Sequence, residues 1–176
     1  MQLTLKPHPD TPPADPPFEV WASVDHAAAF GAVGTVNIWF GIKAPADRFV
    51  LPEGEGGRAD ELWQTTCFEA FLRVDSEEAY REWNFAPNGQ WAAYDFASYR
   101  DGRSNAEVKE PYIRLEDNLT WWKLGATIGV EAGPSWLLGL SVILEEKDGT
   151  KSYWALAHAE GEPDFHDPGC FAARLA

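Results

Sequence analysis

Apolar residues alternate with polar or small residues through most of this chain, and this pattern constrains the fold more than any other feature. A period of two places every second side chain on the same face of an extended strand, so it predicts β-strands. Helical periodicity persists nowhere for more than two turns, and we expect only short helical turns at 59–65 and 76–81. The clearest alternating segments are residues 18–24, 36–42, 68–74, 90–96, 122–130 and 136–144. The chain is therefore expected to be all-β.

Turn residues divide the alternating segments into about nine or ten strands. Pro87-Asn88-Gly89 joins a short strand containing Trp83 and Phe85 to the strand at 90–96, because Gly89 tolerates a positive φ. The last two strands are expected at 152–158 and 171–175. One flat open sheet would leave a face and two edges unprotected. The expected architecture is therefore a two-sheet antiparallel β-sandwich or jelly roll.

The length and the proline distribution indicate one domain preceded by an arm. The chain has 176 residues, enough for one domain with a sizeable core. Residues 1–17 hold six of its 13 prolines, and proline blocks helix formation and removes a donor from a strand ladder. We expect a proline-rich extended N-terminal arm over residues 1–17 and a β-sandwich domain over residues 18–176.

Acidic residues outnumber basic ones by 28 to 14, which gives a net charge of −14. Such a charge repels phosphate backbones and anionic membranes, so neither nucleic acid nor a membrane is an expected partner. The N-terminus has no apolar signal-peptide core, and no run approaches the roughly 18 apolar residues of a membrane span. A cytoplasmic location follows as an expectation. Cys67 and Cys170 are expected to be reduced, buried thiols.

The aromatic content of 14%, with nine tryptophans, is the compositional outlier. An exposed tryptophan beside polar groups can bind carbohydrate, because the apolar face of a pyranose packs on the ring while carboxylates and amides bind the hydroxyls. Trp83, Trp122 and Trp136 lie in alternating apolar runs and are expected in the core. Trp63 follows an acidic loop and precedes a strand, a position that fits a site as well as it fits the core.

Three polar residues fall on one face of two neighbouring predicted strands. Glu69 lies between apolar residues of the first strand, and Glu82 and Asn84 lie on the polar face of the next. Together they could bind the hydroxyl groups of a polyol. The alternative interpretation is that they form only the solvated face of the sheet, which is the usual reason for alternation.

Four residues near the C-terminus raise the question of a metal site: His158, Asp164, His166 and Asp167. Their spacing matches no closed zinc pattern, and Cys67 and Cys170 do not form a CxxC partner for them. A loop that hydrogen-bonds its own backbone is the preferred interpretation, with a sugar-contacting or pH-sensitive histidine as the alternative. No cofactor is predicted. Calcium stays a candidate because acidic loops offer oxygen ligands, although no EF-hand spacing is present.

No catalytic motif was found in the sequence. It contains no G-x-S-x-G, Walker loop, G-x-G-x-x-G or H-E-x-x-H. Glu69 and Glu82 could in principle serve as a glycosidase pair, but carboxylates are common in so acidic a chain. The chain is therefore predicted not to be an enzyme.

Three stretches resemble the DOMON-like proteins, a group related to the family-nine carbohydrate-binding modules. They are LWQTTCFEAF at 62–71, EWNFAPNGQW at 82–91 and PDFHDP at 163–168. The resemblance covers most of the chain beyond the arm and implies an immunoglobulin-like or jelly-roll β-sandwich. In the sugar-binding modules two aromatic rings clamp the terminal sugar. The matching positions here are Trp63 and Phe165, with Glu69 as the strand glutamate and Asn84 near a polar group of the following strand.

The chain departs from that family pattern at two points near the second ring. Phe165 stands in place of a tryptophan and His166 in place of an arginine, so the ring area and the fixed positive charge are both reduced. Heme-binding DOMON relatives use methionine and histidine ligands, whereas the only methionine here is Met1, so heme is not expected.

The sequence thus favours a non-catalytic domain that binds a small ligand, with a small carbohydrate or polyol held between two aromatic rings as the leading hypothesis. The ligand-binding residues predicted are Trp63, Glu69, Asn84, His158, Asp164, Phe165 and His166. The alternative hypothesis is a structural or protein-interaction β-sandwich domain, whose exposed sheet edge or tryptophan patch meets a protein partner.

Overall fold

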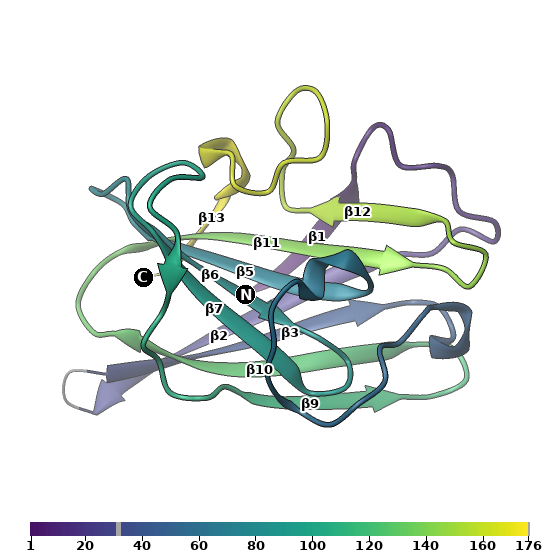
Figure 1. Cartoon of the computed structure of the whole chain (residues 1–176), viewed down its shortest axis with the longest axis horizontal. Helices are drawn as coiled ribbons and strands as arrows, with labels where there is room; N and C mark the ends of the chain where they lie inside the picture. Colours follow the sequence, from purple (N-terminus) through teal and green to yellow (C-terminus); the bar gives the residue numbers. More distant parts are fainter. Residues whose placement is uncertain (31–32, 176) are drawn as a thin grey trace.

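The computed structural model describes residues 1–30 and 33–175, and these form strands and a few short 3-10 turns (Figure 1). The strands are β1 (Gln2–Pro7), β2 (Val20–Phe30), β3 (Val33–Ile42), β4 (Gly57–Arg58), β5 (Cys67–Val74), β6 (Tyr80–Phe85), β7 (Gln90–Phe96), β8 (Ser104–Asn105), β9 (Tyr112–Asp117), β10 (Trp122–Glu131), β11 (Trp136–Glu145), β12 (Lys151–Ala155) and β13 (Ala173–Leu175). The 3-10 turns are η1 (Ala46–Arg48), η2 (Leu62–Gln64) and η3 (Pro168–Cys170). The prediction of a β-rich chain is confirmed.

The strands follow one continuous hydrogen-bonded path, β4-β7-β6-β5-β11-β12-β1-β2-β3-β10-β9, with β13 beside β11 and β8 beside β7. The path curls on itself, so that β2, β3, β9 and β10 lie below β5, β6, β7 and β11 in Figure 1. The shape is a half-barrel. Neighbouring strands are antiparallel except β4 and β7, which are parallel.

The predicted pair of separate antiparallel sheets is not confirmed, because strand β1 joins the two halves. Its first part pairs with β2, with Leu5 opposite Val20, and its end pairs with β12, with Pro7 opposite Trp154. One short strand therefore belongs to both halves and joins them into a single curled sheet. Prolines mark the first seventeen residues as extended chain, but nothing in that pattern shows that the chain crosses between the two halves.

The alternating segments locate most of the long strands. Those at 36–42, 68–74, 90–96, 122–130 and 136–144 coincide with β3, β5, β7, β10 and β11 to within a few residues, and Gly89 in the predicted turn has a φ of 85°. The first helical turn matches η2. The second, at 76–81, is wrong because Tyr80 and Arg81 begin β6.

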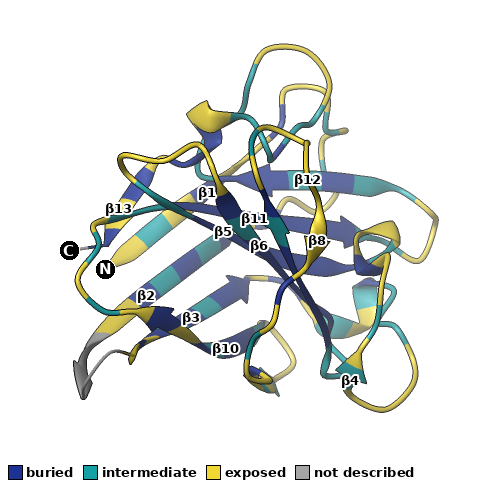
Figure 2. Ribbon diagram, turned by 60° about the vertical axis from the view of Figure 1, so that its left-hand side comes forward, coloured by how far each residue is buried: buried dark blue, intermediate teal, exposed yellow. Residues whose placement is uncertain are grey.

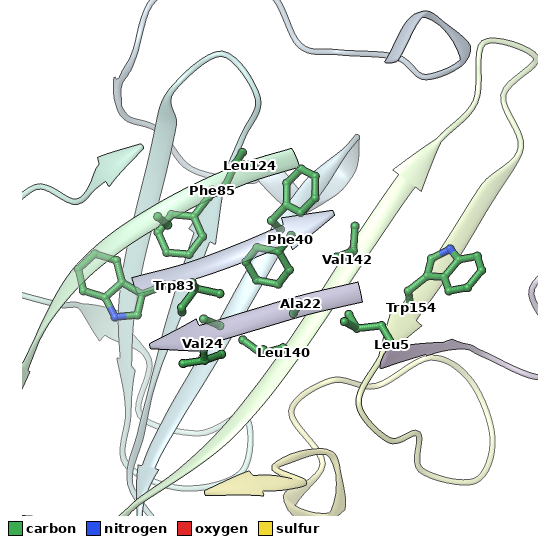
Figure 3. Close-up of a cluster of buried hydrophobic side chains, with 14 of the residues drawn as sticks. Leu5, Ala22, Val24, Phe40, Trp83, Phe85, Leu124, Leu140, Val142 and Trp154 are labelled. Atoms are coloured by element: carbon green, nitrogen blue, oxygen red, sulfur yellow. The ribbon is translucent and has the colours of Figure 1, made fainter. Parts of the chain in front are cut away.

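The main core lies between the two halves of the curled sheet. Figure 3 shows Val24 and Phe40 of one half in the same cluster of buried side chains as Trp83 and Leu140 of the other. Trp83 and Trp122 are almost completely buried, as the alternation predicts, whereas Trp136 is only partly buried against this core.

The half that contains β5, β6 and β7 is buried on both faces. Phe68 and Leu72 of β5 pack in the main core, while Phe71, on the opposite face, packs with Phe165 and Phe171 in a second cluster. Figure 2 accordingly shows β5, β6 and β11 mostly in the buried and intermediate colours. This second face carries the candidate site.

The structure describes both cysteines and the character of the helices. Cys67 and Cys170 are free thiols and both are buried, as predicted. Within residues 1–30 and 33–175, no helix has the length and apolar character needed to cross a membrane.

The joining role of β1 generates a stability prediction. Leu5 is 2% exposed and packs in the main core where β1 passes from one half to the other. Leu5→Ala should lower the free energy of unfolding by about 2–5 kcal/mol, because it removes buried methyl groups and leaves a cavity. Thr4→Ala, at an exposed position of the same strand, should change it by less than about 0.5 kcal/mol. Urea unfolding curves measure both, and equal effects of the two variants would contradict the role given to β1.

Candidate functional site

A cleft of about 760 Å³ opens on the outer face of the half-sheet that contains β5, β6, β7, β11 and β12. Its lining combines aromatic rings, carboxylates and cationic side chains. The lining residues are Trp63, Glu69, Glu82, Tyr94, Phe96, Arg100, Arg103, Ile143, Lys151, Tyr153, Glu162, Pro163, Phe165 and His166.

The floor of the cleft is a row of polar side chains on three adjacent strands. In the strand register Ser141 of β11 lies opposite Glu69 of β5, and Glu69 lies opposite Asn84 of β6. Ser141 Oγ donates a hydrogen bond of 2.8 Å to Glu69 Oε2, and Asn84 Nδ2 donates one of 2.6 Å to Glu82 Oε1. The three predicted residues Glu69, Glu82 and Asn84 do share one face. They are buried, at 4%, 6% and 1% exposed, so the interpretation of a merely solvated face is wrong.

Burial sets the protonation of the floor. Removal from water disfavours a charged carboxylate, and together with the nearby Glu82 it raises the pKa of Glu69 to about 8, against the opposing hydrogen bond from Ser141. Burial also raises the pKa of Glu82, opposed by its hydrogen bond from Asn84 and by the cations of Arg103 and Arg100. Glu69 is therefore a protonated carboxylic acid at neutral pH, and it can donate as well as accept a hydrogen bond.

His166 forms one wall of the cleft in its neutral form. Its Nδ1 lies 2.8 Å from the hydroxyl oxygen of Tyr80, and its Nε2 lies 3.8 Å from Glu82 Oε2. Burial, with the cations of Arg100 and Arg103, lowers the pKa of His166 to about 4, although Asp164 acts in the other direction. A neutral imidazole offers one donor and one acceptor, and the bond to Tyr80 occupies one of them.

Arg100 is held at the cleft by Asp164. The Nη2 and Nε atoms of Arg100 donate to Asp164 Oδ1 at 2.8 Å and 3.2 Å, and the hydroxyl of Tyr99 also donates to the Asp164 carboxylate. The same carboxylate accepts a hydrogen bond from the backbone N–H of His166. These partners lower the pKa of Asp164 against the effect of its partial burial. Asp164 therefore positions two lining residues and is not itself part of the lining.

Arg103 is supported by the ring of Tyr94. Its guanidinium carbon lies 3.9 Å from the ring centroid, a cation–π arrangement. The Tyr94 hydroxyl donates a hydrogen bond of 2.5 Å to Asp60, and burial with this bond raises the pKa of Tyr94 to about 12. Arg103 is exposed to solvent and lines the cleft, so its guanidinium donors are accessible there.

Trp63 and Phe165, the two predicted ring positions, both line the cleft but offer unequal surfaces. Trp63 lies in η2 and is 53% exposed, and the neighbouring Gln64 carbonyl accepts a hydrogen bond from Lys151 Nζ of β12. Phe165 is 8% exposed because it packs near the rings of Tyr153 and His158, with centroid distances of 6.4 Å and 6.2 Å. Trp63 therefore presents most of the accessible aromatic surface.

The remaining predicted residues support the cleft from outside its lining. Asn84 belongs to the row of the floor and fixes Glu82, but it is not among the residues that line the cleft. His158 donates a hydrogen bond from Nε2 to the Lys6 carbonyl oxygen at 2.8 Å and packs edge-on against His8. It thus fastens β1 near the cleft, and it is not among the residues that line the cleft, although its ring centroid lies 6.2 Å from that of Phe165.

None of the three cationic side chains that line the cleft was predicted from the sequence. Arg100 and Arg103 lie in the irregular segment after β7, where no periodicity predicts the direction of a side chain. Lys151 begins β12 and Tyr94 is at an outward position of β7, so alternation could have placed both on the same face as Glu82.

The cluster of acidic and histidine residues near the C-terminus performs structural tasks. Asp164 holds Arg100, and Asp167 accepts a hydrogen bond from the backbone N–H of Gly169 at the start of η3. These are the local backbone and loop contacts that the preferred interpretation expected. Within residues 1–30 and 33–175, no three His, Cys, Asp or Glu side chains form a group that could hold a metal ion.

Comparison with known proteins shows the fold. No family model matches the chain, and no curated protein matches it. The structure of a candidate carbohydrate-binding protein from Bacteroides uniformis superposes with a TM-score of 0.58 at 15% identity, covering 97% of this chain and 83% of that one. A family-nine carbohydrate-binding module from Caldicellulosiruptor kristjanssonii, in complex with glucose, gives a TM-score of 0.47 at 10% identity, with coverages of 82% and 69%. The likeness to the Bacteroides uniformis protein, at 15% identity, is one of fold alone, and kinship with the DOMON-like proteins stays a prediction.

The raised pKa of Glu69 predicts a pH-dependent stability. The folded protein keeps a proton between pH 4.5 and about 8 that the unfolded chain has released, so this group makes the free energy of unfolding fall as pH rises across that range. Glu69→Gln removes the titration. The free energy of unfolding of the variant minus that of the wild type should therefore increase from pH 5 to pH 9, as measured by urea unfolding.

An exposed carboxylate provides the control for that measurement. Glu160→Gln lies in the loop beyond β12 and should leave the pH profile of stability unchanged. Parallel profiles of wild type and Glu69→Gln would show that Glu69 titrates alike in the folded and unfolded chains, contrary to the burial argument.

Proposed function

We propose that this chain is a non-catalytic domain that binds a small neutral carbohydrate or polyol in the cleft between Trp63 and Phe165. One observation carries the proposal. A half-exposed tryptophan ring lines a cleft whose floor consists of buried, hydrogen-bonded carboxyl groups. The aliphatic face of a sugar ring packs on an indole, and its hydroxyls need partners that both donate and accept.

The cleft supplies both kinds of hydrogen-bonding group. Glu82 offers acceptor oxygens, protonated Glu69 offers a donor, and the Arg103 guanidinium offers a planar set of donors. These groups are preorganised, because Ser141 and Asn84 hold the two carboxyl groups before any ligand arrives. A ligand with hydroxyls in a fixed ring matches this arrangement without having to order it.

The size and the charge of the cleft favour a small neutral ligand. Its volume of about 760 Å³ lies within the usual 300–1,000 Å³ of small-molecule sites. With Glu69 protonated, the lining carries the carboxylates of Glu82 and Glu162 and three cationic side chains, those of Arg100, Arg103 and Lys151. Asp164, just outside the lining, pairs with Arg100, so the charges around the cleft balance and favour neither an anion nor a cation. The comparison with known structures adds only the fold, and the ligand rests on this geometry.

The proposed function is binding without catalysis. Glu69 and Glu82 are already engaged with Ser141 and Asn84. We therefore expect incubation with oligosaccharides to release no reducing sugar above the rate of Glu69→Gln. Product formation that Glu69→Gln abolishes would instead identify the two carboxyl groups as a hydrolytic pair.

Tryptophan fluorescence during sugar titration tests the binding site. A panel of monosaccharides and short oligosaccharides should include one that changes the emission saturably, because a sugar packed on Trp63 alters the surroundings of an exposed indole. Trp63→Ala should weaken the binding of that sugar about tenfold or more, measured by calorimetry. Trp121→Ala removes another exposed indole, outside the cleft, and should leave the affinity unchanged.

The results that would contradict the proposal are equally specific. A folded protein that responds to no sugar in the panel would refute carbohydrate binding. A sugar response that survives Trp63→Ala but disappears in Trp121→Ala would place the ligand away from the cleft.

A protein-interaction role is the second candidate, and one observation favours it. Leu115, Leu119 and Trp121 at the hairpin of β9 and β10 are 38%, 90% and 37% exposed. Exposed apolar side chains that gather at one place often mark a protein contact. Under this alternative, Leu119→Ser with Trp121→Ala would abolish capture of a protein partner while sugar titrations stayed flat in wild type and variant alike.

A further inference from the structure

The outer face of the other half-sheet, β2-β3-β10-β9, is built from polar and aromatic side chains in cross-strand rows. The inward residues of these strands, such as Val24 and Phe40, fill the main core, so the residues between them point outward. The strand register places the outward residues in three rows: Trp21, Gly41, Lys123 and Glu116; Ser23, Trp39, Gly125 and Arg114; Asp25, Asn37, Thr127 and Tyr112.

A groove of about 350 Å³ lies over the second and third rows. The outward side chains among its lining residues are those of Asp25, Asn37, Trp39, Tyr112, Arg114 and Thr127. This groove is on the opposite side of the main core from the cleft described above, because the two half-sheets face each other across that core. The two cavities share no lining residue.

Trp39 forms a fixed wall of the groove. A Cβ atom at Gly125 would lie 2.8 Å from Trp39 Cζ3, so the missing side chain at Gly125 is what allows the indole to lie against β10. The guanidinium carbon of Arg114 and the Nζ of Lys123 lie 4.2 Å and 4.3 Å from the ring centroid and hold it by cation–π attraction. Trp39 is partly exposed, and an indole held on a rigid sheet loses little freedom when a ligand contacts the part of the ring that these neighbours leave open.

The floor of the groove has hydrogen-bonding capacity to spare. Thr127 Oγ1 donates to Asn37 Oδ1 at 2.7 Å, which leaves the Asn37 Nδ2 group as a donor and the Thr127 oxygen as an acceptor. Asp25 Oδ1 lies 3.9 Å from the N-terminal ammonium group of Met1, and Arg114 Nε lies 3.7 Å from Glu116 Oε1. The Asp25 side chain is nevertheless 77% exposed and the Arg114 side chain 51% exposed, so an acceptor and a donor with remaining hydrogen-bonding positions flank the floor. Tyr112 adds a ring and a hydroxyl at 66% exposure.

We propose that this groove is a second binding site, which takes a short linear oligosaccharide lying across the strands. The row from Asp25 to Tyr112 crosses four strands at about 4.8 Å spacing and so extends over roughly 14 Å. The mixture of aromatic rings and separate donors and acceptors suits a chain of hydroxyl-bearing rings, and the opposite charges of Asp25 and Arg114 favour a neutral ligand. The site uses none of the residues of the cleft and is independent of ligand binding there.

Indole resonances of the isotope-labelled protein test this site directly. The probes are cellotriose, xylotriose and maltotriose, each titrated into wild type, Trp63→Ala and Asn37→Ala. With at least one probe the Trp39 indole N–H signal should shift saturably, and it should do so with the same affinity in Trp63→Ala. Asn37→Ala should weaken this response about tenfold. Thr35→Ala, an exposed position of the same strand outside the groove, should leave it unchanged.

The other possible results separate binding in the cleft from binding in the groove. If only the Trp63 signal responds, the cleft binds sugar and the second site does not exist. If only the Trp39 signal responds, the second site stands and the proposed function of the cleft fails. If the Trp39 signal stays fixed with all three probes, or shifts only with protein concentration, the oligosaccharide site is overturned, and the concentration dependence would identify this face as a self-association surface.

Discussion

The burial of Glu69 beside Glu82 is the constraint on which the rest of the candidate site depends. Glu69 and Glu82 line the cleft but are only 4% and 6% exposed, and two carboxyl groups so close together and so little exposed to water cannot both stay charged. One of them keeps its proton, and the pKa of Glu69 rises to about 8. The neighbouring strands provide the hydrogen bonds that make this burial tolerable, from Ser141 and Asn84. The result is a floor that holds a donor and an acceptor in fixed positions.

This arrangement is possible because β5 lies at the centre of a half-sheet that is covered on both faces. Phe68 fixes the strand in the main core, and Phe71 fixes it from the other side under Phe165 and Phe171. Glu69 sits between these two anchors on the covered face, so its position follows from apolar packing on either side of it. The site is thus rigid for the same reason that the fold is stable.

The alternation of apolar and polar residues predicted more of the residues on the floor of the cleft than of those on its walls. Glu69, Glu82 and Asn84 share a face because strand geometry leaves no other choice once β5 and β6 pair. Their burial could not be predicted, because it depends on the distant segment that contains Phe165 and Phe171. The direction of the Arg100 side chain could not be predicted either, because it is set by a loop and by the ion pair between Arg100 and Asp164.

The fold shows the same division between local and long-range information. The long strands follow from alternation, but the edge strand β9 was not predicted, because Ile113 and Leu115 are the only two residues of its apolar face and the strand is mostly exposed. Strand β1 was not predicted because its residues pair with two strands, β2 and β12, that local alternation does not reveal. This double pairing joins the two expected sheets into one curled sheet.

The most direct test is to follow the titration of the Glu69 carboxyl carbon by NMR, without and with a saturating sugar. We expect a midpoint of about 8 in the free protein, and a different midpoint when a sugar hydroxyl occupies the floor of the cleft. A midpoint at the ordinary value of 4.5 would show that burial does not hold a proton on Glu69. A midpoint that no sugar changes would show that the buried carboxyl group does not meet the ligand.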